Sequence, residues 1–377
     1  MKAKILYVID NLEFGGGERG FAQLAEGLRE RYEILFACSP GGLLETRLGT
    51  LGVPIRPLDF RRRVSLADLA RLFGILRSER VRLVHSMGAR ADFAARVAGR
   101  LARTPVIVST IAMFVEGYEV SRVRRALYLV AARLTERFAD GFIAVSDAIR
   151  KTLVGGHRIP EEKVVRIYSG VELEAFQPGG RDWFRVKREL GFDPEAPLVG
   201  TIGRLVYQKA HDVFLQAASL VAKAVPDVQF LIVGEGPLRP GLEVLSRELG
   251  LRSCRFVGFR EDIPNTLSIM DVFVLSSVLE GLPRVLLEAL AMARPVVATR
   301  LDGVTEVIQD GLTGLLVPPR DPAALADAIV SLLKDQDPAR RLGQAGRKLV
   351  EERFAVSRMV AEVDRFYTTL LEKKGIR

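Results

Sequence analysis

The feature that most constrains the fold is an alternation of short apolar runs with amphipathic helical patterns, which occurs in two series along the chain. The first series of expected strands comprises Ile5–Ile9, Glu33–Ala37, Leu83–His85, Val106–Ser109 and Gly141–Val145. The second comprises Leu198–Ile202, Gln229–Val233, Cys254–Val257, Val272–Leu275 and Pro295–Ala298. Nearly continuous apolar strands that alternate with helices are typical of parallel sheets covered on both faces. The sequence therefore predicts an α/β protein with two doubly wound domains.

The length agrees with two domains, because 377 residues exceed one typical core of about 100–200 residues. The expected boundary lies near Phe176–Pro197, where two Gly/Pro clusters flank a short charged helix. We therefore predict a first domain up to residue 175 and a second domain from residue 176. Near the end of the sequence, the segment from Phe354 to Lys373 has the pattern of an amphipathic helix.

The composition indicates the cellular location of the protein and the kinds of site that it is expected to lack. The chain has only two cysteines, Cys38 and Cys254, and three histidines, so neither a disulfide framework nor a metal site is expected. The first apolar run ends at Asp10 after five residues, which is too short for a signal peptide. No apolar stretch of 18 or more residues occurs, so no membrane span is expected either. These features predict a cytoplasmic protein.

The net charge of +9 suits nucleic acid, anionic lipid or phosphate-bearing substrates. Aromatic residues amount to 7% of the chain, and no strand carries stacked aromatics between basic residues. Nucleic acid is therefore not an expected partner.

The clearest candidate site follows the expected strand Val272–Leu275, where the sequence reads Glu280-Gly-Leu-Pro-Arg-Val-Leu-Leu-Glu288. Pro283 suits the first position of a helix, because its missing N–H group would have no partner there. The helix start presents free N–H groups and a positive dipole end, which bind phosphate. Glu288 lies about 7–8 Å beyond Pro283, so the two carboxylates can meet hydroxyl groups on either side of a diphosphate. The alternative is that Glu280 caps the helix and Glu288 makes a surface ion pair.

A second candidate follows the strand Leu198–Ile202, where the sequence reads Gly203-Arg204-Leu-Val-Tyr-Gln-Lys209. The glycine permits a sharp turn, Arg204 offers a planar fork of donors for pyrophosphate, and Lys209 adds a mobile charge. Both cations would stabilise the charge that develops on a leaving diphosphate. The alternative is a solvated basic loop.

These motifs resemble those of glycosyltransferase family 4, a group of retaining enzymes of the GT-B type with two Rossmann-like domains that face each other across a cleft. The resemblance covers nearly all of the chain and is most specific in the second half. There it includes Gly203-Arg204 with Lys209, Val233–Pro237, Phe256–Phe259, the Glu280/Glu288 pair, and Asp310–Val317.

The resemblance implies a role for each of these residues. Arg204 and Lys209 would hold the diphosphate of a nucleotide sugar donor, Glu288 the ribose hydroxyls, and Glu280 the transferred sugar. Glu280, Arg204 and Lys209 are thus the expected catalytic residues. The rest of the donor site would be formed by Gly203 and by backbone groups of Gly281, Leu282, Pro283 and Arg284. The tail helix would cross back, so that residues 355–377 complete the acceptor-side domain 1–175 and the donor-binding domain is 176–354.

The first half matches the family more loosely. Gly15-Gly-Gly-Glu-Arg-Gly20 resembles a glycine-rich loop of the family, so Gly16 and Gly17 are expected near the donor phosphates. The same glycines also fit the dinucleotide fingerprint. However, Asp10–Phe14 separates them from the strand, and the second strand ends without a carboxylate, so NAD is not an expected cofactor.

The main departure from the family is at Ala112, which stands where many members carry a histidine after the strand Val106–Ser109. His85, at the end of another strand, is the remaining candidate for a catalytic histidine. For a lone histidine, however, a packed or hydrogen-bonded structural role is favoured over a catalytic one.

The expected reaction is a metal-independent hexosyl transfer that needs no cofactor, since Arg204, Lys209 and the helix start would replace a metal. The acceptor would be lipid-linked or a saccharide, in cell-envelope polysaccharide or glycolipid synthesis. Two other functions stay open, a nucleotide-sugar epimerase on the same fold and a non-catalytic nucleotide-sugar-binding protein.

A peripheral contact with anionic membrane is a further expectation, on the inner face of the membrane. Over Ser121–Phe138 the apolar residues share one helical stripe beside several arginines, and Arg61, Arg62 and Arg63 form another basic cluster. A basic amphipathic helix of this kind binds anionic lipid. The sequence alone favours the simpler interpretation, in which the stripe packs against the sheet and the arginines still face lipid.

Overall fold

The computed structural model describes residues 2–10, 15–58, 64–113, 122–179 and 182–376, apart from the side chains of residues 122 and 124. The chain forms two compact units. Unit 1 comprises Met1–Gly170 with Val356–Arg377, and unit 2 comprises Val171–Ala355. The chain passes from unit 1 to unit 2 after residue 170, five residues before the expected boundary at 175. It returns to unit 1 after residue 355, one residue beyond the expected boundary at 354.

Unit 1 is built on parallel strands: β1 (Lys4–Ile9), β2 (Glu33–Cys38), β3 (Ile55–Pro57), β4 (Leu83–Met87), β5 (Val106–Ile111), β6 (Gly141–Ala144) and β7 (Val164–Arg166). They form a seven-stranded sheet in the order β3-β2-β1-β4-β5-β6-β7. The order reverses between β1 and β4, which is the pattern of a doubly wound sheet.

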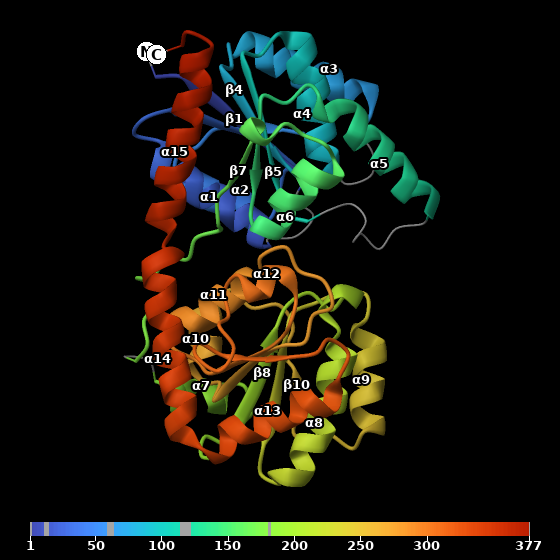
Figure 1. The fold of residues 1–377 in the computed structure, drawn as a ribbon, viewed down its shortest axis with the longest axis vertical. Helices are drawn as coiled ribbons and strands as arrows, with labels where there is room; N and C mark the ends of the chain where they lie inside the picture. The colour runs from blue at the N-terminus through green and yellow to red at the C-terminus, as the bar shows by residue number, and fades with distance from the viewer. Residues whose placement is uncertain (1, 11–14, 59–63, 114–121, 180–181, 377) are drawn as a thin grey trace. The chain divides into compact units, whose positions relative to one another are not determined.

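Helices cover both faces of this sheet (Figure 1). They are α1 (Gly16–Leu28), α2 (Leu43–Thr50), α3 (Leu66–Ser78), α4 (Ala89–Ala102), α5 (Arg122–Glu136), α6 (Asp147–Lys151) and α15 (Val356–Lys373), with shorter turns at η2 (Thr152–Gly156) and η3 (Glu161–Lys163). One face packs against α1, α2 and α15, and the other against α3 and α4. Local sequence sets some of the helix starts. For example, Ser65 and Asp68 form a capping box that begins α3.

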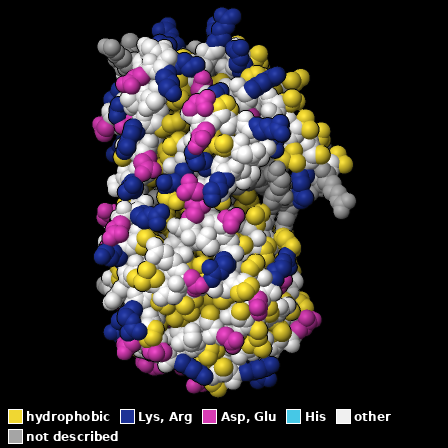
Figure 2. All heavy atoms as spheres, in the orientation of Figure 1, with side chains coloured by type: hydrophobic (Ala, Val, Ile, Leu, Met, Phe, Trp, Pro, Cys, Tyr) yellow, Lys and Arg dark blue, Asp and Glu magenta, His cyan; other side chains and the backbone are white. Residues whose placement is uncertain are grey.

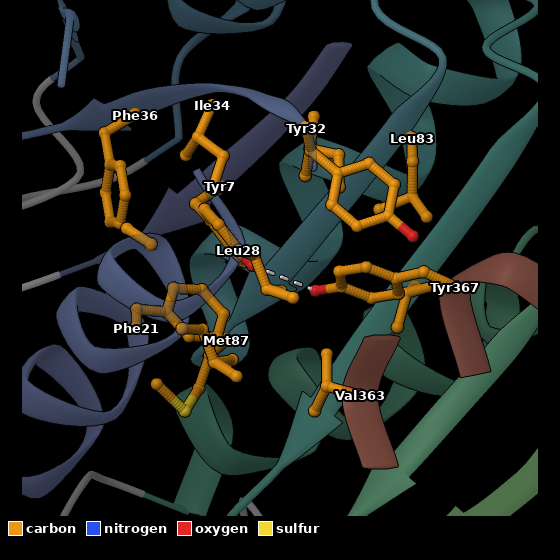
Figure 3. Packing of buried hydrophobic residues seen from close by; sticks show 14 of the residues in the cluster. Tyr7, Phe21, Leu28, Tyr32, Ile34, Phe36, Leu83, Met87, Val363 and Tyr367 are labelled. Atoms are coloured by element: carbon orange, nitrogen blue, oxygen red, sulfur yellow. Dashed lines mark hydrogen bonds between the residues drawn. The ribbon is translucent and has the colours of Figure 1, made fainter. Parts of the chain in front are cut away.

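The C-terminal helix α15 is an integral part of the core of unit 1. Tyr367 is fully buried, and its hydroxyl lies 3.3 Å from that of Tyr7 on β1 (Figure 3). Val363 packs in the same cluster with Phe21 and Leu28 from α1. The amphipathic pattern of the tail, expected from Phe354, thus corresponds to a helix that begins at Val356.

Unit 2 has its own parallel sheet. Its strands are β8 (Leu198–Ile202), β9 (Gln229–Val233), β10 (Cys254–Phe256), β11 (Val272–Leu275), β12 (Val296–Thr299) and β13 (Leu315–Val317). The order is β10-β9-β8-β11-β12-β13. The helical elements are α7 (Trp183–Glu189), η4 (Tyr207–Lys209), α8 (His211–Ala224), α9 (Arg239–Glu248), α10 (Ile263–Ser268), α11 (Arg284–Ala291), α12 (Asp302–Thr305), α13 (Pro322–Lys334) and α14 (Gln336–Arg353). Figure 1 shows them on both sides of the strands.

All ten expected strands are present, with ends that differ by at most two residues. The strands not expected are β3, β7 and β13, which have three residues each and lie at sheet edges, where the apolar run is too short to recognise. The α/β fold class with two parallel sheets is confirmed. No helix formed by the described residues is long and apolar enough to cross a membrane.

Candidate functional site

The two candidate motifs of unit 2 lie at the carboxyl ends of adjacent strands. β8 pairs directly with β11, and the strand order reverses between them. In open parallel sheets this switch point is where the loops diverge and leave room for a ligand. Gly203, Arg204 and Lys209 follow β8, whereas Glu280 lies in the loop that follows β11. The structure therefore brings the two motifs together.

The two loops meet in a direct ion pair. Lys209 Nζ lies 2.6 Å from Glu280 Oε1, and the Ser277 hydroxyl donates to the same oxygen at 2.6 Å. The exposed fraction is 21% for the Lys209 side chain and 6% for that of Glu280. A carboxylate with two donors on one oxygen is held in a defined orientation, and its second oxygen still has acceptor capacity.

Further hydrogen bonds join the two loops. The backbone N–H of Val278 donates to the carbonyl of Gln208 at 2.8 Å, and the Ser276 hydroxyl lies 3.0 Å from the Lys209 carbonyl. Thr299, at the end of β12, donates its hydroxyl to the Ser277 carbonyl. The position of the ion pair is thus set by the ends of three neighbouring strands.

The helix after this loop begins one residue later than expected. Pro283 is the residue that precedes α11, and Arg284 is the first helical residue. Gly281, Leu282 and Pro283 are buried, and so is Glu288 on the helix. The backbone of this loop packs tightly: a Cβ atom on Gly303 would lie 2.0 Å from the carbonyl oxygen of Gly281. The first-turn N–H groups of α11 point out of the helix start, where an anion is stabilised.

A third loop supports the basic loop, a role that the sequence motif Val233–Pro237 did not reveal. The N–H of Gly203 donates to the Val233 carbonyl and the N–H of Leu205 to the Glu235 carbonyl, both at 2.9 Å. A Cβ atom on Gly234 would lie 1.9 Å from the Gly203 oxygen. Gly234 also has φ +134, so a glycine is required there twice over.

Arg204 is exposed beside this support, while His211 at the start of α8 is buried. Burial, together with the nearby charge of Lys209, lowers the pKa of His211 to about 3, so this histidine is neutral. The loop after β8 therefore offers two cations, Arg204 and Lys209, ahead of α8, whose first turn holds the neutral His211 and the acidic Asp212. The two cations suit the binding of a diphosphate, and the neighbouring Glu280 carboxylate can accept hydrogen bonds from hydroxyl groups.

Gly16 and Gly17 belong to unit 1, where they form the first turn of α1. The preceding Gly15 donates its N–H to the Glu18 carboxylate at 2.9 Å. A Cβ atom on Gly17 would lie 2.8 Å from Cε of Met87, so Gly17 permits close packing against β4. Ala112 comes directly after β5, at the carboxyl edge of the same sheet.

His85, the candidate catalytic histidine, lies in the core of unit 1. It is fully buried, with Nε2 2.7 Å from the Thr110 hydroxyl and Nδ1 in contact with the Tyr367 hydroxyl. Burial lowers its pKa to about 3. Both ring nitrogens are engaged, which favours the structural role over the catalytic one.

One Asp-x-Asp sequence occurs, at Asp335-Gln-Asp337, where helix α14 begins, rather than after a strand. The Asp335 carboxylate accepts the N–H of Asp337 and caps α14. Within the described ranges, no group of three or more potential metal ligands is found.

Two family models match the chain. Residues 15–170 match the glycosyl transferase 4-like domain, and residues 196–335 match the glycosyl transferases group 1 domain. The first range lies within unit 1 and the second within unit 2, and together they cover most of the chain.

Several characterised proteins are similar in sequence. An alpha-D-kanosaminyltransferase of Streptomyces kanamyceticus is 32% identical over 232 residues, 60% of each chain. UDP-Gal:alpha-D-GlcNAc-diphosphoundecaprenol alpha-1,3-galactosyltransferase of Escherichia coli is 27% identical over 319 residues, 81% of each chain. A D-inositol 3-phosphate glycosyltransferase of Corynebacterium urealyticum is 35% identical over 53% of this chain and 50% of its own. The similarity to the first and third thus spans less than two thirds of those relatives.

Similar structures extend over nearly the whole chain. Anabaena HepE, in a crystal structure with UDP and glucose, has a TM-score of 0.86 at 22% identity, covering 97% of this chain and 100% of its own. A glycosyltransferase of Rickettsia africae has a TM-score of 0.81 at 23% identity, covering 98% and 99%. At these identities the likeness concerns the fold, which consists of two parallel-sheet α/β units like those of GT-B glycosyltransferases.

Proposed function

The chain belongs to the group 1 glycosyltransferases, and we propose from this premise that it transfers a hexosyl group from a nucleotide diphosphate sugar to a lipid-linked or saccharide acceptor. The observation that carries the proposal is the convergence of Lys209 and Ser277 on Glu280 at the β8/β11 switch point, in front of α11. To bind a nucleotide sugar, a site needs a carboxylate for the sugar hydroxyls, and cations and a helix start for the diphosphate. One pair of loops supplies all of these groups here.

We assign the donor site to unit 2. Arg204 and Lys209 bind the diphosphate together with the N–H groups at the start of α11, and Glu280 binds the hydroxyl groups of the sugar. Glu288, about 7–8 Å along α11 from Pro283, binds the ribose. The backbone of Gly203 and of Gly281 to Arg284 lines the site. Gly16 and Gly17, at the start of α1 in unit 1, are further donor-binding residues in this proposal.

The proposed reaction retains the configuration at the anomeric carbon and needs no metal. The bond between the anomeric carbon and the diphosphate oxygen breaks first, with the developing charge stabilised by Arg204, Lys209 and the helix start. The acceptor hydroxyl attacks from the same face, forms the new carbon–oxygen bond, and passes its proton to the leaving phosphate oxygen. No step requires a histidine at position 112.

The lipid-linked class of acceptor is supported by the name of the Escherichia coli relative, whose acceptor is a diphosphoundecaprenol-linked sugar. Synthesis of a cell-envelope polysaccharide or glycolipid is the corresponding process, and the cytoplasm is the corresponding location. UDP sugars are the first donors to test, since the same relative is named for UDP-Gal.

The test begins with a thermal-shift panel of nucleotides and nucleotide sugars, followed by calorimetry with the nucleoside diphosphate that binds. Losing a charged hydrogen bond to a buried partner costs about 1.5–3 kcal/mol, so Arg204→Ala and Glu288→Gln should each bind it at least about tenfold more weakly. Unchanged affinity in both variants would contradict the assignment. Lys348→Ala, on the exposed surface of α14, is the control for a lost cation.

Catalysis is tested with the wild type and Ala112→His, using the stabilising donor and membrane extract as the source of acceptor. We expect transfer by the wild type. Removing one polarising group usually costs about 10²–10⁴ in rate, not all of it. A wild type that binds donor but neither transfers nor hydrolyses it, while Ala112→His does both, would make the protein a non-catalytic binder. Interconversion of the donor sugar without transfer would indicate an epimerase.

A further inference from the structure

Helix α5 exposes an apolar stripe to solvent. The exposed fractions are 71% for Val123, 64% for Leu127, 56% for Val130 and 58% for Leu134. These residues are spaced three or four apart, so they share one face of the helix. Among the described residues, no other helix or strand exposes more than two large hydrophobic side chains. In Figure 2, hydrophobic side chains gather where Figure 1 shows α5.

The exposed face is also basic and carries no carboxylate among its described side chains. Arg133 is exposed beside the stripe, and Arg137 is exposed in the turn that follows the helix. Arg133 uses one nitrogen to donate to the Gly156 carbonyl at 3.0 Å, which leaves other N–H groups of its guanidinium for a ligand. The acidic residue of this helix, Glu136, is turned away and lies 2.6 Å from the imidazole of buried His157.

We propose that the α5 face, defined by Val123, Leu127, Val130 and Leu134 with Arg133 and Arg137, docks unit 1 on a membrane surface that contains anionic phospholipid. A helix of this kind lies in the interface, with its apolar side among the acyl chains and its arginines at the phosphate groups. The alternative in which the stripe packs against the sheet is excluded by the exposure of its four residues. The cluster Arg61–Arg63 lies outside the described residues and is not used here.

Charge complementarity favours lipid over a second copy of this chain. Pairing two copies of the α5 face would place Arg133 and Arg137 of one copy close to those of the other, with no carboxylate on the face to neutralise them. Anionic lipid supplies the opposite charge, and the net charge of +9 attracts the whole protein to it. The proposal does not rest on sugar transfer, because it involves no residue of the donor site.

The experiment is co-sedimentation of the full-length protein with vesicles of phosphatidylcholine alone and of phosphatidylcholine with phosphatidylglycerol, at low and physiological salt. The wild type should bind only the anionic vesicles. The double variant Leu127→Glu/Leu134→Glu should lose this binding by at least about tenfold, because it removes apolar burial and adds repulsion. Arg133→Glu/Arg137→Glu should lose at least about tenfold as well, with a steeper loss at low salt.

Two variants on α3 of the same unit are matched controls. Leu66, with 85% exposure, is replaced by Glu, and Arg71→Glu/Arg77→Glu makes the same charge change as the α5 pair. Leu66→Glu should bind like the wild type, and Arg71→Glu/Arg77→Glu should lose much less binding than the α5 arginine pair. Circular dichroism and thermal melting check that every variant is folded, and calorimetry with a nucleoside diphosphate checks unit 2 separately.

Three results would overturn the proposal. The first is no binding of the wild type to anionic vesicles at low salt. The second is an equal loss in the α3 and α5 arginine pairs, since that would make the attraction a property of net charge. The third is a dimer of the wild type in sedimentation analysis that Leu127→Glu/Leu134→Glu converts to monomer without any change in vesicle binding.

Discussion

Lys209 and Glu280 are 71 residues apart in the chain, and yet Nζ of the one lies 2.6 Å from Oε1 of the other. The lysine charge is therefore partly neutralised before any ligand arrives. An incoming diphosphate has to share Lys209 with Glu280. The two residues should therefore have opposite effects on the affinity for a diphosphate, because Lys209 attracts it and Glu280 repels it.

We expect Glu280→Gln to bind free nucleoside diphosphate about threefold to tenfold more tightly than the wild type, since it removes a negative charge beside the phosphate site. Lys209→Ala should bind it at least about tenfold more weakly. Isothermal titration calorimetry measures both. Glu243→Gln, which removes a carboxylate that pairs with Arg239 on α9, should change nothing. Weaker binding in Glu280→Gln would mean that this carboxylate does not oppose the diphosphate.

Ser277 is expected to act as a positioning residue for Glu280, because its hydroxyl donates to the carboxylate at 2.6 Å. Ser277→Ala should lower kcat/KM for the sugar donor by about tenfold, the usual cost of one hydrogen bond to a charged group. Its affinity for free diphosphate should not fall. Ser277→Thr, which keeps the hydroxyl, should recover part of the activity. An equal loss of diphosphate affinity and melting temperature in Ser277→Ala would indicate a merely structural role.

His85 should make unit 1 sensitive to acid. Its pKa is lowered by burial to about 3, against an ordinary value of 6.5, so the native state binds fewer protons than the unfolded state between these values. The free energy of unfolding therefore falls as the pH falls below 6.5, by about 2 kcal/mol at pH 5. Asp92 acts in the opposite direction, because burial raises its pKa to about 6.

The comparison of His85→Gln with the wild type isolates this effect, since Asp92 is common to both. Glutamine can still bond to Thr110 and Tyr367. Urea titrations at pH 7.5 and pH 5, followed by circular dichroism, should show a smaller loss of stability in the variant. His157→Gln is the control, because it replaces another histidine of unit 1, whose imidazole lies 2.6 Å from the Glu136 carboxylate. An acid sensitivity identical in all three proteins would contradict the prediction.

Ala293 should be improved by glycine. It follows α11 with φ +52, a left-handed conformation that costs an alanine about 1–2 kcal/mol. Glycine relieves this cost and loses about 0.4–1 kcal/mol through the freedom of the unfolded chain. Ala293→Gly should therefore stabilise unit 2 by about 0.5–1 kcal/mol, measured by denaturant titration. Ala328→Gly, inside α13, should destabilise it by about 1 kcal/mol.

The sequence predicts elements and neighbours better than contacts. β8 and β11 are recognisable because each is a continuous apolar run, and their adjacency follows from the strand order of a doubly wound sheet. This was enough to place Lys209 and Glu280 at neighbouring strand ends. That they form an ion pair, with Ser277 on the same oxygen, depends on loop backbone that no periodicity describes.

His85 shows the other limit. A lone histidine at the end of a strand is compatible with a site or a core, and the deciding partner, Tyr367, is 282 residues away on α15. The supporting role of Gly234 was also beyond sequence patterns, because its need comes from the carbonyl of Gly203 across the loop. Long-range packing of this kind leaves no local signal.

The position of α15 has a consequence for how the protein is made. Unit 2 is continuous, from Val171 to Ala355, so it can complete its core as soon as it has left the ribosome. Unit 1 is begun before unit 2 and completed after it, because Tyr367 and Val363 fill its core and are translated only after residue 355. Until then, the face of its sheet that α15 covers stays open, and chains released early retain an exposed apolar surface that chaperones and proteases recognise. The core of unit 1 is therefore closed only in chains that extend through α15.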